Sequence, residues 1–239
     1  MSPAGGVLHL IPVTLGDSDA RPVLPQTTID AIAALDYFIV ESEKSARRFL
    51  KSVGHPQPVQ RLTIERFDKD SSPERAEQLL QPLLKGRSAG LLSEAGCPAV
   101  ADPGSLVVAA AHREHLRVAP HVGPSSLLLA LMASGFNGQR FAFHGYLPVQ
   151  KNQCRREIGR LERESGAHGI TQIFIETPYR TDALLQALLE SCAGNTRLCV
   201  ASDLTLATET VRSMTIAAWE KQKLGIGRRN SVFLLYAHY

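Results

Sequence analysis

SEAGCPAVADPG, residues 93–104, is the stretch that decides the fold, because it joins an apolar run typical of a β-strand, Ser88–Leu92, to a predicted helix, Leu106–His112. A structural turn between a strand and a helix needs only a few residues. The two glycines and two prolines of this stretch let the backbone approach a bound molecule closely and hold the loop rigid. In open α/β sheets ligands bind at the carboxyl ends of the strands, so these residues are predicted to form a ligand-binding loop.

Length and charge leave several classes of protein open. The chain has 239 residues and a formal net charge of +3, which suits one large domain or two modest ones and permits an anionic partner such as RNA without requiring it. The four cysteines form no CxxC pair and no cluster with the spacing of a metal site, so we expect neither disulfides nor a bound metal. No leader and no membrane-spanning apolar run are evident, and a cytoplasmic protein is expected.

Short apolar runs alternate with segments of helical periodicity, which predicts the α/β class. A first lobe, residues 1–120, has predicted strands at Val7–Val13, Tyr37–Val40, Ser88–Leu92 and Arg117–Pro120. A second lobe, residues 121–239, has predicted strands at Phe141–Gly145, Ile170–Ile175, Arg197–Ala201 and Val232–Tyr236. The intervening segments, among them Ser45–Val53, Ser125–Ser134, Asn152–Glu164 and Thr181–Cys192, are predicted helices. No long Gly/Ser linker separates the lobes, so we expect them to pack closely, with a ligand cleft between them.

Several loops follow strand ends and are expected to converge. They are Thr14–Asp17, Glu41–Lys44, residues 93–104, Gly123–Ser126, Glu176–Arg180 and Asp203–Thr205. The absence of GxGxxG after the first strand and of GxxxxGK[ST] argues against a dinucleotide enzyme and a P-loop nucleotidase. The absence of GxSxG removes the simplest candidate for a hydrolase.

The order and content of these loops resemble the tetrapyrrole methylase superfamily, within it the branch of small-subunit ribosomal RNA (cytidine ribose 2′-O) methyltransferases. The resemblance extends over nearly the whole chain, and this chain is similar to a short form without the extra C-terminal region. The matching motifs are Ile11–Gly16, Glu41 with Lys44 and Arg47, Ser93–Gly104, Gly123–Ser125, Ser134-Gly135, Arg140–Pro148, Glu176–Arg180 and Ala201–Thr205. The resemblance implies a two-lobed α/β methyltransferase, usually a homodimer, with a mixed sheet flanked by helices in each lobe and S-adenosylmethionine bound in the cleft.

Carried over by position, the resemblance also implies a set of cofactor-binding residues. The methionine end and ribose would meet the first group, and the adenine the second. The first group is Leu15, Glu94, Ala95, Gly96, Val100, Ser125 and Ser126, and the second is Ile175, Glu176, Asp203, Leu204, Asn230 and Ser231. Core packing is an equally good interpretation of Val100 and Leu204.

RNA ribose is the favoured methyl acceptor, and a carboxylate that accepts its proton would help the reaction. Glu41, Glu43 and Asp102 are unranked candidates for this base. Glu41, Lys44, Arg47 and Arg180 are the predicted substrate-binding residues. The basic helix around Arg155, Arg156, Arg160 and Arg163 suits RNA or a solvated face with charge pairs, and His144, Tyr146 and Tyr179 suit base stacking or packing.

Departures from the branch pattern leave two alternatives open. The branch usually has Glu-Asp-Thr-Arg where this chain has Glu41-Ser42-Glu43-Lys44, and an ammonium replaces a guanidinium that binds phosphate in a bidentate manner. A methyltransferase acting on a precorrin or uroporphyrinogen is one alternative, although such members usually carry a glycine-rich first loop. The other is a catalytically idle protein that binds S-adenosylmethionine. The acceptor atom, the base and the need for a dimer are not decided by the sequence.

Overall fold

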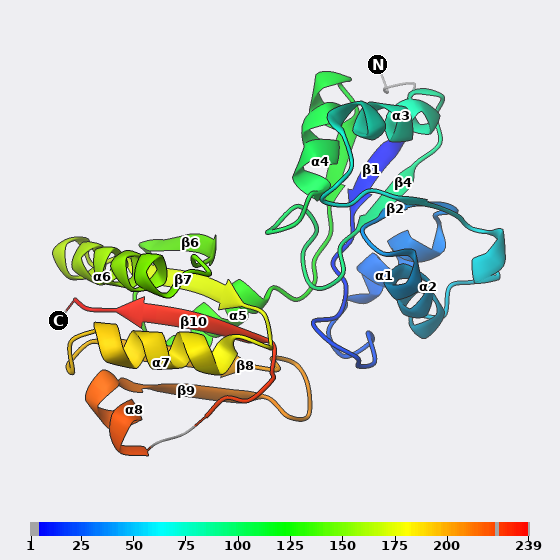
Figure 1. The fold of residues 1–239 in the computed structure, drawn as a ribbon. Helices are drawn as coiled ribbons and strands as arrows, with labels where there is room; N and C mark the ends of the chain where they lie inside the picture. Colours follow the sequence, from blue (N-terminus) through cyan, green and yellow to red (C-terminus); the bar gives the residue numbers. More distant parts are fainter. Residues whose placement is uncertain (1–4, 223–224, 239) are drawn as a thin grey trace. The chain divides into compact units, whose positions relative to one another are not determined.

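The computed structural model describes residues 5–222 and 225–238. The chain divides into two compact units, residues 1–125 and 126–239 (Figure 1). The predicted division into lobes 1–120 and 121–239 stays a prediction. No helix of the described ranges is both long and apolar enough to cross a membrane.

A five-stranded sheet forms the centre of the first unit, in the order β3-β2-β4-β1-β5. Its strands are β1 (Val7–Leu10), β2 (Tyr37–Val40), β3 (Thr63–Arg66), β4 (Ala89–Leu92) and β5 (Arg117–Pro120). The connections contain α1 (Gln26–Ala33), α2 (Glu43–Ser52), the short η1 (Val59–Arg61), α3 (Pro73–Leu84) and α4 (Gly104–Arg113). All four strand pairs are parallel, because every connection returns the chain to the starting edge of the sheet.

Helices cover both faces of this sheet, as the side-chain alternation of β2 makes plain. Tyr37 and Ile39 belong to a buried cluster that α3 and α4 complete. Phe38 and Val40 belong to a second cluster, completed by α1 and α2. Burial on both faces explains why the central strands consist of consecutive apolar residues. All the parallel strands therefore present their carboxyl ends, and the loops that follow them, at one edge.

The second unit contains a five-stranded mixed sheet in the order β6-β7-β10-β8-β9. Its strands are β6 (Phe141–Tyr146), β7 (Thr171–Glu176), β8 (Arg197–Ser202), β9 (Thr210–Thr215) and β10 (Ser231–Tyr236). Its helices are α5 (Ser126–Ser134), α6 (Lys151–His168), α7 (Thr181–Ser191) and α8 (Ile216–Gln222). β6 and β7 are parallel, whereas β10 is antiparallel to both β7 and β8. The start of β10 therefore lies beside the ends of β7 and β8.

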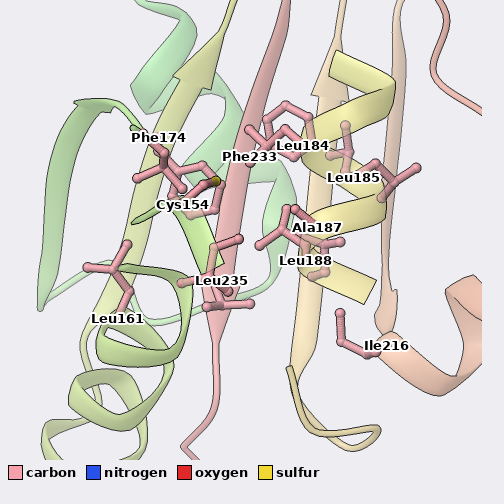
Figure 2. Packing of buried hydrophobic residues seen from close by; sticks show 14 of the residues in the cluster. Cys154, Leu161, Phe174, Leu184, Leu185, Ala187, Leu188, Ile216, Phe233 and Leu235 are labelled. Carbon is pink, nitrogen blue, oxygen red and sulfur yellow. The ribbon is translucent and has the colours of Figure 1, made fainter. Parts of the chain in front are cut away.

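Apolar side chains of α6 and α7 form the larger core of this unit against the sheet (Figure 2). Leu161 of α6 and Leu188 of α7 are fully buried with Phe174 and Phe233, whose parallel rings have centroids 5.9 Å apart. α6 ends at His168, and the capping residue Gly169 adopts the left-handed conformation (φ 63°), which glycine tolerates best. α5 packs against β8, β9 and β10.

The predicted α/β class is confirmed, with three differences in detail. The mixed sheet expected in each lobe occurs in the second unit, whereas the sheet of the first unit is parallel throughout. The strand expected at Val7–Val13 ends at Leu10, and Val13 instead forms an isolated antiparallel bridge with Gly96. β3, β9 and α8 were not predicted.

Candidate functional site

Backbone hydrogen bonds join the loops at the carboxyl edge of the first sheet. Val13 N–H donates to Gly96 O over 2.9 Å, and Glu41 N–H donates to Leu92 O over 3.3 Å. His121 N–H donates to Leu10 O over 2.9 Å. The loops after β1, β2, β4 and β5 thus begin from one connected edge, and they carry the site residues predicted for this part of the chain.

Gly96 is the tightest point of this edge. Its φ is +70°, and a Cβ added there would lie 3.1 Å from Leu15 Cδ2 and 3.5 Å from Pro124 O. Ser93 holds the loop from within, because its hydroxyl donates to the carbonyls of Ala95 and Gly96 over 3.3 and 3.2 Å. The structure therefore brings together Leu15 and Gly96, two of the predicted cofactor residues, in a space that only glycine leaves open.

Asp102 organises the second half of the ligand loop. Its carboxylate accepts hydrogen bonds from Ala99 N–H at 2.9 and 3.0 Å and from Gly104 N–H at 2.7 Å. Ala99 and Ala101 have φ of 67° and 62°, a left-handed conformation that non-glycine residues adopt only at a cost. Burial raises the pKa of Asp102, and the two backbone N–H groups oppose this shift. Because both N–H groups occupy its carboxylate, this candidate base serves the shape of the loop.

Glu41 lines an acidic cleft of about 450 Å³ at the ends of β2, β3 and β4. The cleft is lined by Glu41, Ser42, Glu43, Arg66, Asp68, Lys69, Asp70 and Glu94. Partial burial raises the pKa of Glu41, and the nearby carboxylate of Glu94 raises it further. Glu94 N–H donates to Glu41 Oε2 over 3.4 Å, a weak bond that opposes the shift. Of the three candidate bases, Glu41 is the one whose environment moves its pKa toward neutral while it faces open space.

The other predicted site residues of the first unit differ in their exposure and in their partners. Glu94 and Ala95 are exposed, and Val100 is 46% exposed, which excludes core packing as its role. Lys44 is exposed, whereas Arg47 pairs with Glu43 over 3.3 Å and donates to Val59 O. Ser125 directly follows Pro124, whose carbonyl lies 3.5 Å from Cys97 Sγ. Of the predicted substrate cations here, Lys44 remains available to a ligand.

A buried polar cluster lies where β7, β8 and β10 meet in the second unit. Ser231 is in register with both Glu176 and Ser202, and the Ser202 and Ser231 hydroxyls are 2.7 Å apart. Arg180 Nη2 lies 3.0 Å from Glu176 Oε2, and Thr177 N–H donates to Glu176 Oε1 over 2.7 Å. Glu176 Oε2 nevertheless has no aligned hydrogen-bond donor within the described residues.

The loop after β8 is strained and held from outside. Asp203 and Thr205 have φ of 51° and 70°. Arg229 Nε lies 2.7 Å from Asp203 Oδ2, and Asp203 N–H donates to Asn230 O over 2.9 Å. The buried hydroxyl of Thr205 has no hydrogen-bond partner in the parts of the chain that the structure covers. Strain of this kind often accompanies a functional loop.

The structure places the remaining predicted residues of the second unit along the same edge. Ile175 is partly buried opposite Val232, and Leu204 is 7% exposed, so packing accounts for much of its contact. Asn230 is exposed, and Ser126 begins α5. The structure thus brings Ile175, Glu176, Asp203, Leu204, Asn230 and Ser231 together and adds Arg229, which the sequence did not single out. Its position just before a predicted strand, opposite an acid at another strand end, was the available signal.

The basic helix α6 is largely neutralised by its own acids. Arg160 lies 2.6 Å from Glu157 and 2.9 Å from Glu164, and Arg155 pairs with Glu190 of α7. Arg156 and Arg163 are exposed and have no ion pair in the described ranges. This matches a solvated helix with charge pairs more closely than a continuous phosphate-binding surface.

The donor set fits an adenosyl sulfonium ligand better than a metal. Gly96 leaves a cradle that a Cβ would fill, and the buried Thr205 Oγ1 offers a polar atom without a hydrogen-bond partner among the described residues, whereas Glu176 Oε2 is paired with Arg180. An adenosyl ligand requires polar atoms of this kind together with apolar surface. Among residues 5–222 and 225–238, no group of three or more His, Cys, Asp or Glu side chains is placed to hold a metal ion.

Comparisons with known proteins agree over nearly the whole chain. The family model described as Tetrapyrrole (Corrin/Porphyrin) Methylases matches residues 8–219. Ribosomal RNA small subunit methyltransferase I of Xylella fastidiosa (strain Temecula1) is 34% identical over 221 residues, which are 91% of this chain and 75% of that protein. The protein of the same name from Vibrio cholerae is 29% identical over 215 residues, 88% of this chain and 69% of that protein. The crystal structure of diphthine synthase superposes with a TM-score of 0.69 at 14% identity, covering 97% of this chain and 90% of that one, a likeness of fold alone.

Proposed function

Because this chain belongs to the tetrapyrrole (corrin/porphyrin) methylase family, we propose that it transfers the methyl group of S-adenosylmethionine to a ribose 2′-hydroxyl of small-subunit ribosomal RNA. One observation carries the proposal. Relatives named ribosomal RNA small subunit methyltransferase I match this chain at up to 34% identity over 91% of its length. The matched range includes every loop at the carboxyl edge of the first sheet.

We propose that the cofactor is held by two sets of residues. In the first unit these are Leu15, Glu94, Ala95, Gly96, Val100 and Ser125, and in the second Ser126, Ile175, Glu176, Asp203, Leu204, Asn230 and Ser231. The cradle at Gly96 and the buried polar cluster of Glu176, Ser202 and Ser231 support this assignment. Isothermal titration with S-adenosylmethionine tests it, and each set is tested separately by substitutions at Gly96 and at Glu176.

The cofactor, when bound, supplies an electrophilic methyl group, and the residues of the chain position the acceptor and exclude water. We propose that Glu41 accepts the proton of the ribose hydroxyl. Its raised pKa brings it closer to the working pH than an ordinary carboxylate. Glu43 is exposed and pairs with Arg47, and Asp102 is occupied by backbone N–H groups, so neither is as free to take up a proton.

The acceptor is tested with small ribosomal subunits purified from cells that lack the gene. The expected result is one new ribose methylation, found by mass spectrometry of RNase fragments, that depends on the protein and on S-adenosylmethionine. An unchanged ribose-methylation map together with tight cofactor binding would favour the idle binding protein or the tetrapyrrole enzyme. Methylation of uroporphyrinogen in a parallel assay would then separate these two.

We further propose that the protein acts in the cytoplasm as a homodimer. Leu128 and Met132, one helical turn apart on α5, are 52% and 80% exposed and would suit a face between two copies. Light scattering of the wild-type protein and of Met132→Glu tests this. A dimer that the charge dissociates is expected, and a monomeric wild type would contradict the proposal.

A further inference from the structure

Tyr179 and Arg228 form an exposed aromatic and cationic pair in the second unit. Arg228 Cζ lies 5.4 Å from the centre of the Tyr179 ring. Tyr179 is 80% exposed, and Arg228 is exposed as well. Proteins that bind single-stranded nucleic acid stack bases on exposed aromatic rings and contact phosphates with neighbouring basic side chains.

Two side chains of α7 fix the segment that carries Arg228. Asp182 Oδ1 accepts hydrogen bonds from Ile226 N–H at 2.7 Å and from Gly227 N–H at 3.1 Å. The hydroxyl of Thr181 donates to Gly227 O over 2.6 Å. Figure 1 shows this segment before β10 running beside the start of α7. Hydrogen bonds between the start of α7 and the segment before β10 therefore hold Arg228 close to the Tyr179 ring.

The neighbouring charges leave Arg228 free for a ligand. Arg180 is paired with the buried carboxylate of Glu176, and Arg229 with Asp203. Arg228 has no ion pair within the described part of the chain. Both side chains are close in sequence to proposed adenine-binding residues. Tyr179 follows Glu176 by three residues, and Arg228 precedes Asn230 by two.

We propose that Tyr179 and Arg228 form a stacking platform for a nucleotide of the RNA substrate, with the ring under a base and the guanidinium at its phosphate. The proposal rests on the proposed RNA methyltransferase function. It assigns Tyr179, for which the sequence left base stacking and packing open, to the RNA, and it adds Arg228, which no sequence motif includes. Stacking on an aromatic side chain tolerates any base, so this platform contributes affinity more than sequence selection.

The test measures RNA binding and cofactor binding on the same full-length variants. The probe is a fluorescein-labelled single-stranded RNA of twelve nucleotides, followed by fluorescence anisotropy. Tyr179→Ala and Arg228→Ala are each expected to raise its Kd by about 5- to 150-fold, the range that loss of one base stack of about 1–3 kcal/mol gives. Tyr179→Phe keeps the ring and is expected to bind within about 2-fold of the wild type. The same is expected of Arg163→Ala, because Arg163 is an exposed arginine of α6 that lies over no aromatic ring among the described residues.

Isothermal titration with S-adenosylmethionine completes the test, and its Kd is expected to stay the same in all four variants. A Tyr179→Ala protein that loses cofactor affinity but keeps RNA affinity would overturn the inference and assign the ring to the adenine. Equal losses at Arg163 and Arg228 would also overturn it, since they would reflect general charge. If the wild type and Tyr179→Ala methylate ribosomal subunits equally well, the stacking platform is wrong and the proposed function is retained. A wild type with no RNA affinity and no activity on RNA would remove both.

Discussion

At the scale of single residues, a comparison with Gly54 separates two effects of substituting Gly96, the filling of space beside Leu15 and the strain of a positive φ. Both have φ near +70°, but an added Cβ at Gly54 meets nothing within 4 Å, whereas at Gly96 it meets Leu15. Gly96→Ala and Gly54→Ala are each expected to lose about 1–2 kcal/mol of stability from the left-handed conformation, and Gly96→Ala somewhat more because of the contact with Leu15. Only Gly96→Ala is expected to raise the Kd for S-adenosylmethionine, by about tenfold or more, as measured by isothermal titration. Equal affinity in both variants would place the cofactor elsewhere.

Glu41 combines a proposed chemical role with a cost in stability. Its pKa is raised in the folded protein by burial and by Glu94, so the folded state binds a proton more tightly than the unfolded state does. Stability due to this group is therefore lost as the pH rises from the ordinary value of 4.5 through the folded pKa. Glu41→Gln is expected to raise the melting temperature at pH 7 by about 1–2 °C, which corresponds to under 1 kcal/mol, and to lower kcat for methyl transfer about 100-fold or more.

The matched control for this substitution is Glu43→Gln, in the same loop. Glu43 is exposed and forms an ion pair with Arg47 over 3.3 Å, so its loss is expected to change stability slightly, or to lower it, and to leave kcat within a few-fold. Thermal unfolding between pH 5 and pH 8, with methyl transfer measured on the same samples, checks both variants. If Glu41→Gln were no more stable than Glu43→Gln and equally active, neither the raised pKa nor the role as base would hold.

At the scale of elements, a histidine pair joins β1 to the residue that directly follows β5. His9 Nδ1 and His121 Nε2 are 2.8 Å apart, and the two rings are stacked with centroids 5.1 Å apart. One ring must stay neutral to accept the hydrogen bond. Burial lowers the pKa of both residues, and for His9 the neighbours His121 and Arg117 lower it further.

This pair is expected to make the first unit sensitive to acid. Because the folded pKa values lie below 6.5, the value expected in the unfolded chain, stability is lost as the pH falls from about 6.5 toward the folded pKa values. His121→Gln keeps a hydrogen-bonding side chain and is expected to reduce this loss between pH 7 and pH 5. Urea unfolding across that range measures it. The exposed His112→Gln serves as control, and an equal change in both variants would contradict the role of the pair.

The central strands β2 and β4, which are buried on both faces, are among the elements that the sequence predicted. Val40 and Leu92 end central strands whose four residues are all buried, and an uninterrupted apolar run indicates such strands directly. The edge strands β3 and β9 consist of TIER and TVRSMT and are at most half-buried. Their polar side chains hide the alternation that a sequence pattern depends on, and only pairing with a neighbouring strand selects the extended form.

For the site, the sequence led to the superfamily, while the site residues themselves stay a prediction. The ordered loops led to the correct superfamily, which the family match over residues 8–219 confirms. The hydrogen-bond partners of Asp102 and Arg229 were not predictable, because only the folded loops bring those backbone and side-chain groups near. A motif records which residues occur together, and the partner of each side chain depends on the fold.

At the scale of the whole molecule, a net charge of +3 limits the electrostatic share of RNA affinity. Many arginines are paired with carboxylates, among them Arg47, Arg160 and Arg180. For single-stranded RNA, log Kd rises with log salt by about 0.7 for each phosphate contacted. We expect a slope of about 2, which corresponds to two or three phosphates, and a slope above about 4 would require a basic surface that these ion pairs do not leave.

The same salt series separates the two members of the stacking platform. Arg228 is proposed to contact a phosphate, so Arg228→Ala is expected to lower the slope by about 0.7, the contribution of one released counterion. Tyr179→Ala removes only the uncharged ring, so it is expected to raise Kd by the same factor at every salt concentration and to leave the slope unchanged. Anisotropy titrations from about 50 to 200 mM salt, the range over which such slopes are resolved, measure both. If the slope fell equally in the two variants, the ring would be acting only by holding the guanidinium in place, and stacking on a base would be wrong.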